Sequence, residues 1–318
     1  MQIQNFTVES AYDALPLSCT IYEPQGAPKG IFQIVHGMCE YKERYEGFLR
    51  FLAENGFVAA AHDHRGHGRS IRDGGDLGWF GDKKANAIVE DAVQVTRLLK
   101  EKYPGLPLVL FGHSMGSMVV RCYIQKYDGE IDKLIVCGSP SKNPFAGVGV
   151  AMAKSVSLFK GERHRSGTLA QLSTGNGDKK FPGEGKNAWL TRDKEIVEAY
   201  NADEKCNFTF TCNGFENLFR LMQKTYDKGR YAVNNPSLPI FFVSGSDDPV
   251  LVGEEKWFKA QQLLRALEEQ LSGVGQRDAP AVARKELRAH RGLERGDGAG
   301  DCGVAYIERG GGAGQAAL

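Results

Sequence analysis

A serine flanked by glycines is the strongest chemical signal in this sequence. Residues 112–116 read Gly-His-Ser-Met-Gly, with an apolar, strand-like run at 108–111 and a helix-like run at 117–127. In a strand–turn–helix of this kind the turn is so tight that the flanking positions must be small, and the serine hydroxyl projects above the sheet. We therefore predict that Ser114 is a nucleophile that attacks a carbonyl carbon.

Acyl transfer at such a serine also needs two backbone N–H groups that stabilise the developing oxyanion. The amide of Met115, at the start of the predicted helix, is one candidate. The amide of Met38 is the other, because it follows the apolar strand run 30–35 through a short loop. We expect His36 and Gly37 to shape that loop, with His36 bonded to backbone rather than acting as a base.

The nucleophile needs an acid and a histidine, which in this chemistry follow the serine in that order. Residues 245–250, Gly-Ser-Asp-Asp-Pro-Val, come after the apolar run 239–244. They place two candidate acids, Asp247 and Asp248, at the carboxyl end of a predicted strand. Of the seven histidines only His290 comes later. His290 is thus the candidate base by chain order alone, because its surroundings do not look like a strand end entering a catalytic loop.

Short apolar runs alternate with helix-like stretches along most of the chain, which predicts an α/β fold with a mostly parallel central sheet. The alternation breaks between about 141 and 220, and we interpret this stretch as a lid or cap inserted over the sheet. The predicted organisation is a core at 1–140, the insertion at 141–222, a second core part at 223–258 and an atypical tail at 259–318.

Composition excludes several classes of protein. The 318 residues carry a net charge of +1, which gives no reason to expect nucleic acid. No apolar run is long enough to span a bilayer and the start of the chain lacks a signal-peptide pattern. The seven cysteines are scattered and form no C-x-x-C pair, so neither a zinc site nor a redox motif is expected. A reducing, cytoplasmic location is the expectation.

Four motifs together resemble the monoacylglycerol lipase/lysophospholipase branch of the α/β-hydrolases in its bacterial form. They are His-Gly-Met-Cys-Glu with Arg-Tyr (36–40 and 44–45), Asp-His-Arg-Gly-His-Gly-Arg-Ser (63–70), the serine motif (112–116) and the acid loop (245–250). The resemblance covers roughly residues 5–260. One departure lies beside the oxyanion loop, where Cys39 stands in place of the family's glycine.

The resemblance implies an enzyme that cleaves monoacylglycerols, lysophospholipids or related acyl esters and needs no metal or organic cofactor. It selects Asp248 as the catalytic acid, and it places Gly37, Glu40 and Arg44 in the substrate-binding loop. It further implies a cap that forms an apolar acyl channel and makes transient contact with a membrane or micelle surface. Thioester cleavage, amide cleavage and perhydrolysis remain open alternatives.

The tail departs strongly from the family. Tyr306 is the only aromatic residue after position 258, and residues 310–314 are glycine-rich. The family's last strand, histidine loop and closing helix are missing from it. We hypothesise that the tail is translated in a shifted reading frame, since one nucleotide forward residues 289–296 can encode His-(Ile or Thr)-Glu-Val-Leu-Asn-Glu. A naturally divergent, disordered tail is the rival hypothesis. A shifted frame would leave this chain a catalytically impaired or acyl-binding copy without its histidine.

Overall fold

The computed structural model describes residues 1–250 apart from 83, 175–176, 246–247 and 249. Within this part, seven strands form one sheet in the order β1-β2-β4-β3-β5-β6-β7. The strands are β1 (Gln2–Glu9), β2 (Pro16–Glu23), β3 (Gly30–Val35), β4 (Phe57–His62), β5 (Leu108–His113), β6 (Lys133–Cys137) and β7 (Ile240–Val243). The five strands from β4 to β7 in this order are parallel, whereas β1 pairs antiparallel with β2, and β2 pairs antiparallel with β4. The predicted α/β fold is confirmed.

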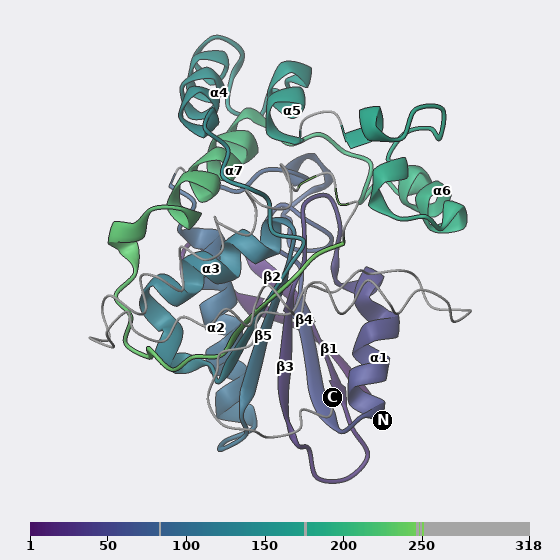
Figure 1. Ribbon diagram of the computed structural model, residues 1–318, viewed down its shortest axis with the longest axis vertical. Coiled ribbons are helices and arrows are strands. Elements are labelled where there is room, and N and C mark those ends of the chain that lie inside the picture. The colour runs from purple at the N-terminus through teal and green to yellow at the C-terminus, as the bar shows by residue number, and fades with distance from the viewer. Residues whose placement is uncertain (83, 175–176, 246–247, 249, 251–318) are drawn as a thin grey trace, which may run out of the picture.

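Helices cover both faces of the sheet (Figure 1). Helix α1 (Glu46–Glu54) lies on one face, and α2 (Ala87–Lys102) and α3 (Met115–Tyr127) lie on the other. Every residue of β3 is buried, and its side chains alternate between the two faces as a strand requires. Ile31 packs into the core under α2 and α3, whereas Phe32 packs into the core under α1. Burial on both faces explains why the strand is a continuous apolar run.

The chain between β6 and β7 forms four helices beyond the carboxyl ends of the parallel strands, at the top of Figure 1. They are α4 (Ala146–Lys160), α5 (Gly167–Thr174), α6 (Lys194–Ala202) and α7 (Cys212–Thr225), and we call residues 146–225 the helical insertion. Residues 148–159 lie within α4. The passage 161–185, which looks polar and glycine-rich in the sequence, contains α5. The role of the insertion as a lid stays a prediction.

Six 3-10 turns complete the described secondary structure. They are η1 (Lys42–Tyr45), η2 (Gly74–Asp76), η3 (Asp128–Glu130), η4 (Gly177–Lys180), η5 (Ala188–Leu190) and η6 (Lys228–Arg230). The predictions that concern the atypical tail, including His290 and the shifted frame, lie outside the described residues.

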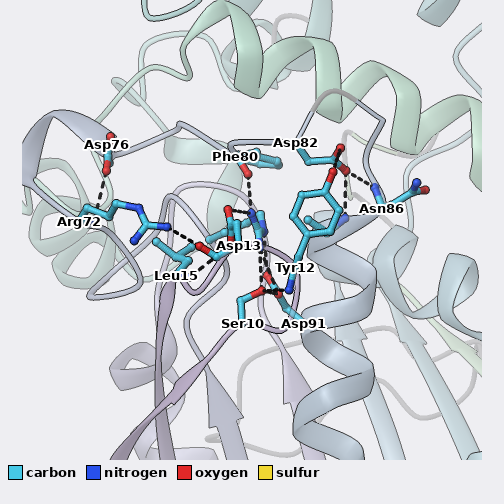
Figure 2. Close-up of polar contacts among 12 residues, drawn as sticks. Ser10, Tyr12, Asp13, Leu15, Arg72, Asp76, Phe80, Asp82, Asn86 and Asp91 are labelled. Carbon is cyan, nitrogen blue, oxygen red and sulfur yellow. Dashed lines mark hydrogen bonds and ion pairs between the residues drawn. The ribbon is translucent and has the colours of Figure 1, made fainter.

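A buried ion cluster fastens the β1–β2 hairpin to α2. The Arg65 guanidinium donates to Asp91 through Nε (2.8 Å) and Nη2 (3.2 Å) and to the two carboxylate oxygens of Asp13 (3.1 and 3.3 Å). It also donates to the Ser10 hydroxyl (3.1 Å) and the Phe80 carbonyl (2.8 Å). Ser10, Asp13 and Asp91 converge in Figure 2. The side chains of Arg65 and Asp91 are each only 1% exposed, so each charge depends on the other.

Replacing Arg65 by methionine is expected to lower the free energy of unfolding by about 3–5 kcal/mol, because it leaves the Asp91 carboxylate buried without its cation. Urea denaturation followed by circular dichroism measures this loss. The double variant Arg65→Met/Asp91→Leu should regain part of the stability, since both charges are then gone. If the losses of Arg65→Met and Asp91→Leu simply add in the double variant, the two side chains do not act as a pair.

Candidate functional site

The nucleophile turn has the geometry that its sequence predicts. Ser114 lies between β5 and α3 with φ +52° and ψ −114°, a conformation that a non-glycine residue adopts only when its surroundings enforce it. Its N–H donates to the carbonyl of Cys137 at the end of β6 (2.9 Å). A Cβ at Gly112 would meet the carbonyl of Gly116, and a Cβ at Gly116 would meet the carbonyl of Val35. Both glycines are therefore required by the close packing of the turn.

The predicted oxyanion loop reaches the nucleophile from β3. A Cβ at Gly37 would lie 3.2 Å from the Cβ of Ser114, so the loop backbone packs directly against the serine. Met115 is the first residue of α3, and the N–H groups of the first turn have no acceptor within a helix. The structure thus brings Gly37 and Met115 to Ser114, with Met38 next in the loop. The donor roles of Met38 and Met115 stay predictions.

Cys39 occupies a left-handed backbone conformation with φ +55°. This explains why the resembling family has glycine here, since only glycine adopts such a φ without strain. The buried Cys39 thiol donates to the carbonyl of Phe208 in the helical insertion (3.3 Å). The departure from the family pattern therefore costs backbone strain and adds a contact between the oxyanion loop and the insertion.

Four buried histidines support the oxyanion loop from below, and we call His36, His62, His64 and His67 the histidine cluster. His36 Nδ1 donates to the carbonyl of Gly37 (2.8 Å), and its Nε2 accepts from the backbone N–H of His64 (2.9 Å). His36 is thus bonded to backbone, as expected from the sequence. Burial lowers the pKa of His36 to about 3 and those of His62 and His67 to about 4, and it lowers that of His64 well below its ordinary value. These rings are neutral and structural.

Glu40 joins the oxyanion loop to the residue that precedes the nucleophile. One of its carboxylate oxygens accepts the Gly37 N–H, the Tyr45 hydroxyl (2.9 Å) and His113 Nδ1 (3.1 Å). Burial alone would raise the pKa of Glu40, but the hydrogen bond and charge of His113 lower it to about 2. Burial likewise opposes the charge of His113, yet Glu40, helped by Asp248, raises the pKa of that ring. The Glu40 carboxylate therefore connects the loop that contains Gly37 to His113, and we call this connection the Glu40 clamp.

Replacing Glu40 by glutamine is expected to slow acylation of Ser114 about tenfold to a hundredfold, because a loosened oxyanion loop no longer holds the N–H donors in place. The rate of labelling by a fluorophosphonate measures this effect. The pKa of His113, followed by NMR, should fall at the same time because the neighbouring anion is lost. Tyr45→Phe is the matched control, since it removes one hydrogen bond to Glu40 and keeps the charge. An unchanged His113 pKa in Glu40→Gln would contradict the clamp.

Arg44 connects the core to the helical insertion rather than to the nucleophile. Its guanidinium lies over the ring of Tyr200 in α6, 4.9 Å from the centroid, and its Nε is 4.0 Å from Glu40. The substrate-binding roles suggested for Gly37, Glu40 and Arg44 stay predictions. In the structure, Gly37 and Glu40 form the oxyanion loop and its clamp, and Arg44 lies beside the insertion.

Asp248 lies at the carboxyl end of β7, as predicted. Its carboxylate accepts the Ser244 hydroxyl (3.1 Å) and the backbone N–H of Val250 (3.0 Å). A Cβ at Gly138 would lie 3.5 Å from Asp248 Oδ2 and 3.5 Å from the ring of His113, so the acid faces the end of the nucleophile strand. No group of three potential ligands that could hold a metal ion occurs among the described residues.

The sequence motifs missed one member of the site. Tyr45 attracted no attention on its own, although its hydroxyl bonds Glu40 and lies 3.0 Å from His113 Nδ1. The contact joins residues 68 positions apart in the chain, so no local spacing reveals it. The only available signal was the Arg-Tyr pair within the family motif.

Comparison with known proteins agrees with this geometry. The family model described as "Serine aminopeptidase, S33" matches residues 26–271. A monoacylglycerol lipase of Mycolicibacterium smegmatis is 32% identical over 58% of this chain and 58% of its own length. The human monoglyceride lipase is 30% identical over 60% of this chain and 57% of its own length. The chain thus spans less than three fifths of these curated relatives.

A solved structure of a thermostable carboxyl esterase from Bacillus coagulans, in complex with glycerol, superimposes with a TM-score of 0.77. It is 28% identical, and the match covers 84% of this chain and 87% of the esterase. The family model matches well over half of the chain, and residues 36–40, 112–116 and 245–250 all lie within the match. The chain therefore belongs to the serine aminopeptidase S33 family of α/β-hydrolases.

Proposed function

We propose that this protein is a serine hydrolase that cleaves carboxylic esters of lipid-like substrates, monoacylglycerols or lysophospholipids. The observation that carries the proposal is the strained Ser114 at the start of α3, against which the Gly37 loop packs. The names of the M. smegmatis and human relatives support monoacylglycerols, and the resemblance of the motifs adds lysophospholipids. A cytoplasmic location is part of the proposal, supported by the six cysteines of the described chain, all free thiols.

In the proposed reaction the Ser114 hydroxyl attacks the ester carbonyl while a histidine takes its proton. The amides of Met38 and Met115 stabilise the oxyanion, and Asp248 holds the histidine in the correct tautomer. The alcohol leaves, and water then releases the fatty acid from the acylated serine. The base proposed by chain order, His290, lies outside the described residues.

The proposal includes transient contact of the helical insertion with a lipid surface. No helix within the described residues is long and apolar enough to cross a membrane. Helix α4 instead exposes apolar side chains outward. Phe145 at its start is 59% exposed, Val148 is 55%, and Leu158 and Phe159 at its end are 81% and 85%. Such a surface is suited to shallow insertion at the boundary between head groups and acyl chains.

Labelling of the purified chain with a fluorophosphonate probe, followed by peptide mapping, tests the proposed nucleophile. We expect the label on the peptide that contains Ser114. Hydrolysis of a monoacylglycerol, compared with the thioester and amide of the same acyl chain, then tests the bond. Faster thioester or amide cleavage would contradict the proposed ester specificity. A label on another serine would contradict the proposed site.

A further inference from the structure

An open groove of about 810 Å³ lies on the helical insertion, and no residue placed in the catalytic site lines it. Three segments form its walls: the loop that contains Lys84, the end of α4 with Lys154 and Leu158, and α7 with Arg220 and Lys224. Helices α4 and α7 lie next to each other at the upper left of Figure 1. The groove is therefore part of the same surface that exposes the apolar residues of α4.

The groove is strongly basic for a chain whose net charge is only +1. Five basic residues line it against two acidic ones, an excess of three positive charges. The basic residues are Lys84, Lys154, Arg220, Lys224 and Arg230, and the acidic ones are Glu162 and Glu216. A concave surface with one sign of charge concentrates its field and attracts anions.

Two of these cations are free to meet a ligand. Arg220 pairs with Glu216 (2.8 Å), Arg230 pairs with Asp227 (3.1 Å), and the Lys224 ammonium donates to the side-chain oxygen of Asn86 (2.5 Å). In contrast, Lys84 and Lys154 are exposed and make no ion pair with any other residue that the structure describes. These two ammonium groups are thus the ones that an incoming anion would meet.

Apolar side chains lie at the same end of α4. Leu158 lines the groove and is 81% exposed, and its neighbour Phe159 is 85% exposed. A free, fully hydrated anion would gain nothing from these side chains. An anionic lipid in a bilayer presents a phosphate beside its acyl chains, and it matches both the cations and the apolar residues.

We propose that this groove binds the phosphate of an anionic phospholipid, with Lys84 and Lys154 on the phosphate and Leu158 and Phe159 in the acyl layer. The inference rests on the lipid-surface contact in the proposed function and names the class of lipid. Such a groove would favour membranes that contain anionic lipid, since an uncharged surface would interact only with the apolar residues Leu158 and Phe159.

Sedimentation of the full chain with vesicles of phosphatidylcholine, with or without phosphatidylglycerol, tests the groove. We expect tighter binding to the phosphatidylglycerol vesicles and loss of that preference at high salt. The variant Lys84→Gln/Lys154→Gln should bind them about 30-fold more weakly, about fivefold for each lysine. Its binding to phosphatidylcholine should stay unchanged. The matched control is Lys29→Gln/Lys133→Gln, whose exposed lysines lie at the amino ends of β3 and β6, away from the helical insertion beyond the carboxyl ends.

If both double variants bind phosphatidylglycerol vesicles equally weakly, the proposed phospholipid site is wrong, because the loss would reflect net charge in general. Binding of inorganic phosphate that depends on Lys84 and Lys154, without any vesicle preference, would assign the groove to a soluble anion and overturn the lipid. Labelling of Ser114 by a soluble fluorophosphonate separates this inference from the proposed function. Normal labelling of Ser114 without any vesicle preference would contradict only the proposed phospholipid site. Binding to phosphatidylglycerol vesicles without labelling would contradict only the proposed hydrolase activity.

Discussion

Replacing Asp248 by asparagine is expected to slow the labelling of Ser114 by a fluorophosphonate about 10⁴-fold, because the histidine base then loses the group that fixes its tautomer. The amide can keep the geometry, since its oxygen can still accept the Val250 N–H and its nitrogen can donate to the Ser244 hydroxyl. The loss should therefore appear in the labelling rate and not in the thermal unfolding midpoint.

Asp247→Asn is the matched control for this experiment, because the residues of the acid loop alone leave both aspartates open. We expect the control to label at nearly the wild-type rate. The reverse result would move the acid to Asp247. If neither variant slows labelling and the wild type labels no faster than His290→Ala, no base acts on Ser114, and the chain is an impaired copy of a lipase-like enzyme.

This protein is expected to unfold at an unusually high pH on acidification, because of the histidine cluster. The unfolded chain takes up protons on these side chains below pH 6.5, whereas burial holds the folded rings neutral until about pH 4 or below. The free energy of unfolding therefore falls as the pH drops through this window, by about 1.4 kcal/mol per pH unit for each histidine. Between pH 7 and 5 the three rings of His36, His62 and His67 together cost about 6 kcal/mol, comparable to the whole stability of a typical domain. His64 acts in the same direction.

Two other groups also make the free energy of unfolding depend on pH, with opposite signs. The raised pKa of His113 gives stability that is gained as the pH falls, and it offsets part of the loss. The lowered pKa of Glu40, about 2, removes further stability below about pH 4.5. Urea unfolding across this pH range measures the sum. In His62→Leu the free energy of unfolding should fall less steeply between pH 6 and 5, by about 1.4 kcal/mol per pH unit, because one fewer proton is taken up on unfolding. Above pH 7 the curves of the variant and the wild type should run parallel. An unchanged slope would contradict the assignment.

The sequence predicts the parallel strands of the sheet better than the antiparallel hairpin. Strands β3, β5 and β7 lie within two residues of the apolar runs that predict them, because each contributes buried side chains to the core. The hairpin of β1 and β2 was missed. Its outer strand, Gln2–Glu9, has no fully buried residue. On its half-buried face only Phe6 and Val8 are apolar, which is too short an alternation to indicate a strand. The inner strand does carry a signal, since Leu17, Cys19 and Ile21 alternate along β2 and are buried.

The site divides in the same way. Local motifs pointed to Ser114 and to the pair Asp247 and Asp248, because a nucleophile turn and an acid loop are continuous in sequence. Only the family resemblance selected Asp248 from that pair. They could not reveal that Glu40 clamps Gly37 to His113, since that contact spans 73 positions and depends on the sheet bringing two strand ends together. The groove beside α4 could not be predicted either, because its cations come from segments far apart in the chain.

The ion cluster around Arg65 also has a consequence for the order of folding. The side chains that it joins are 26 to 81 positions apart, including the Ser10 hydroxyl bonded to Asp91 (2.5 Å). Contacts of such long sequence separation form after shorter loops have closed, because each closure costs chain entropy before the contact repays it. We therefore expect the hairpin to dock after the main barrier to folding has been crossed. In that case the cluster slows the unfolding rate and leaves the folding rate nearly unchanged.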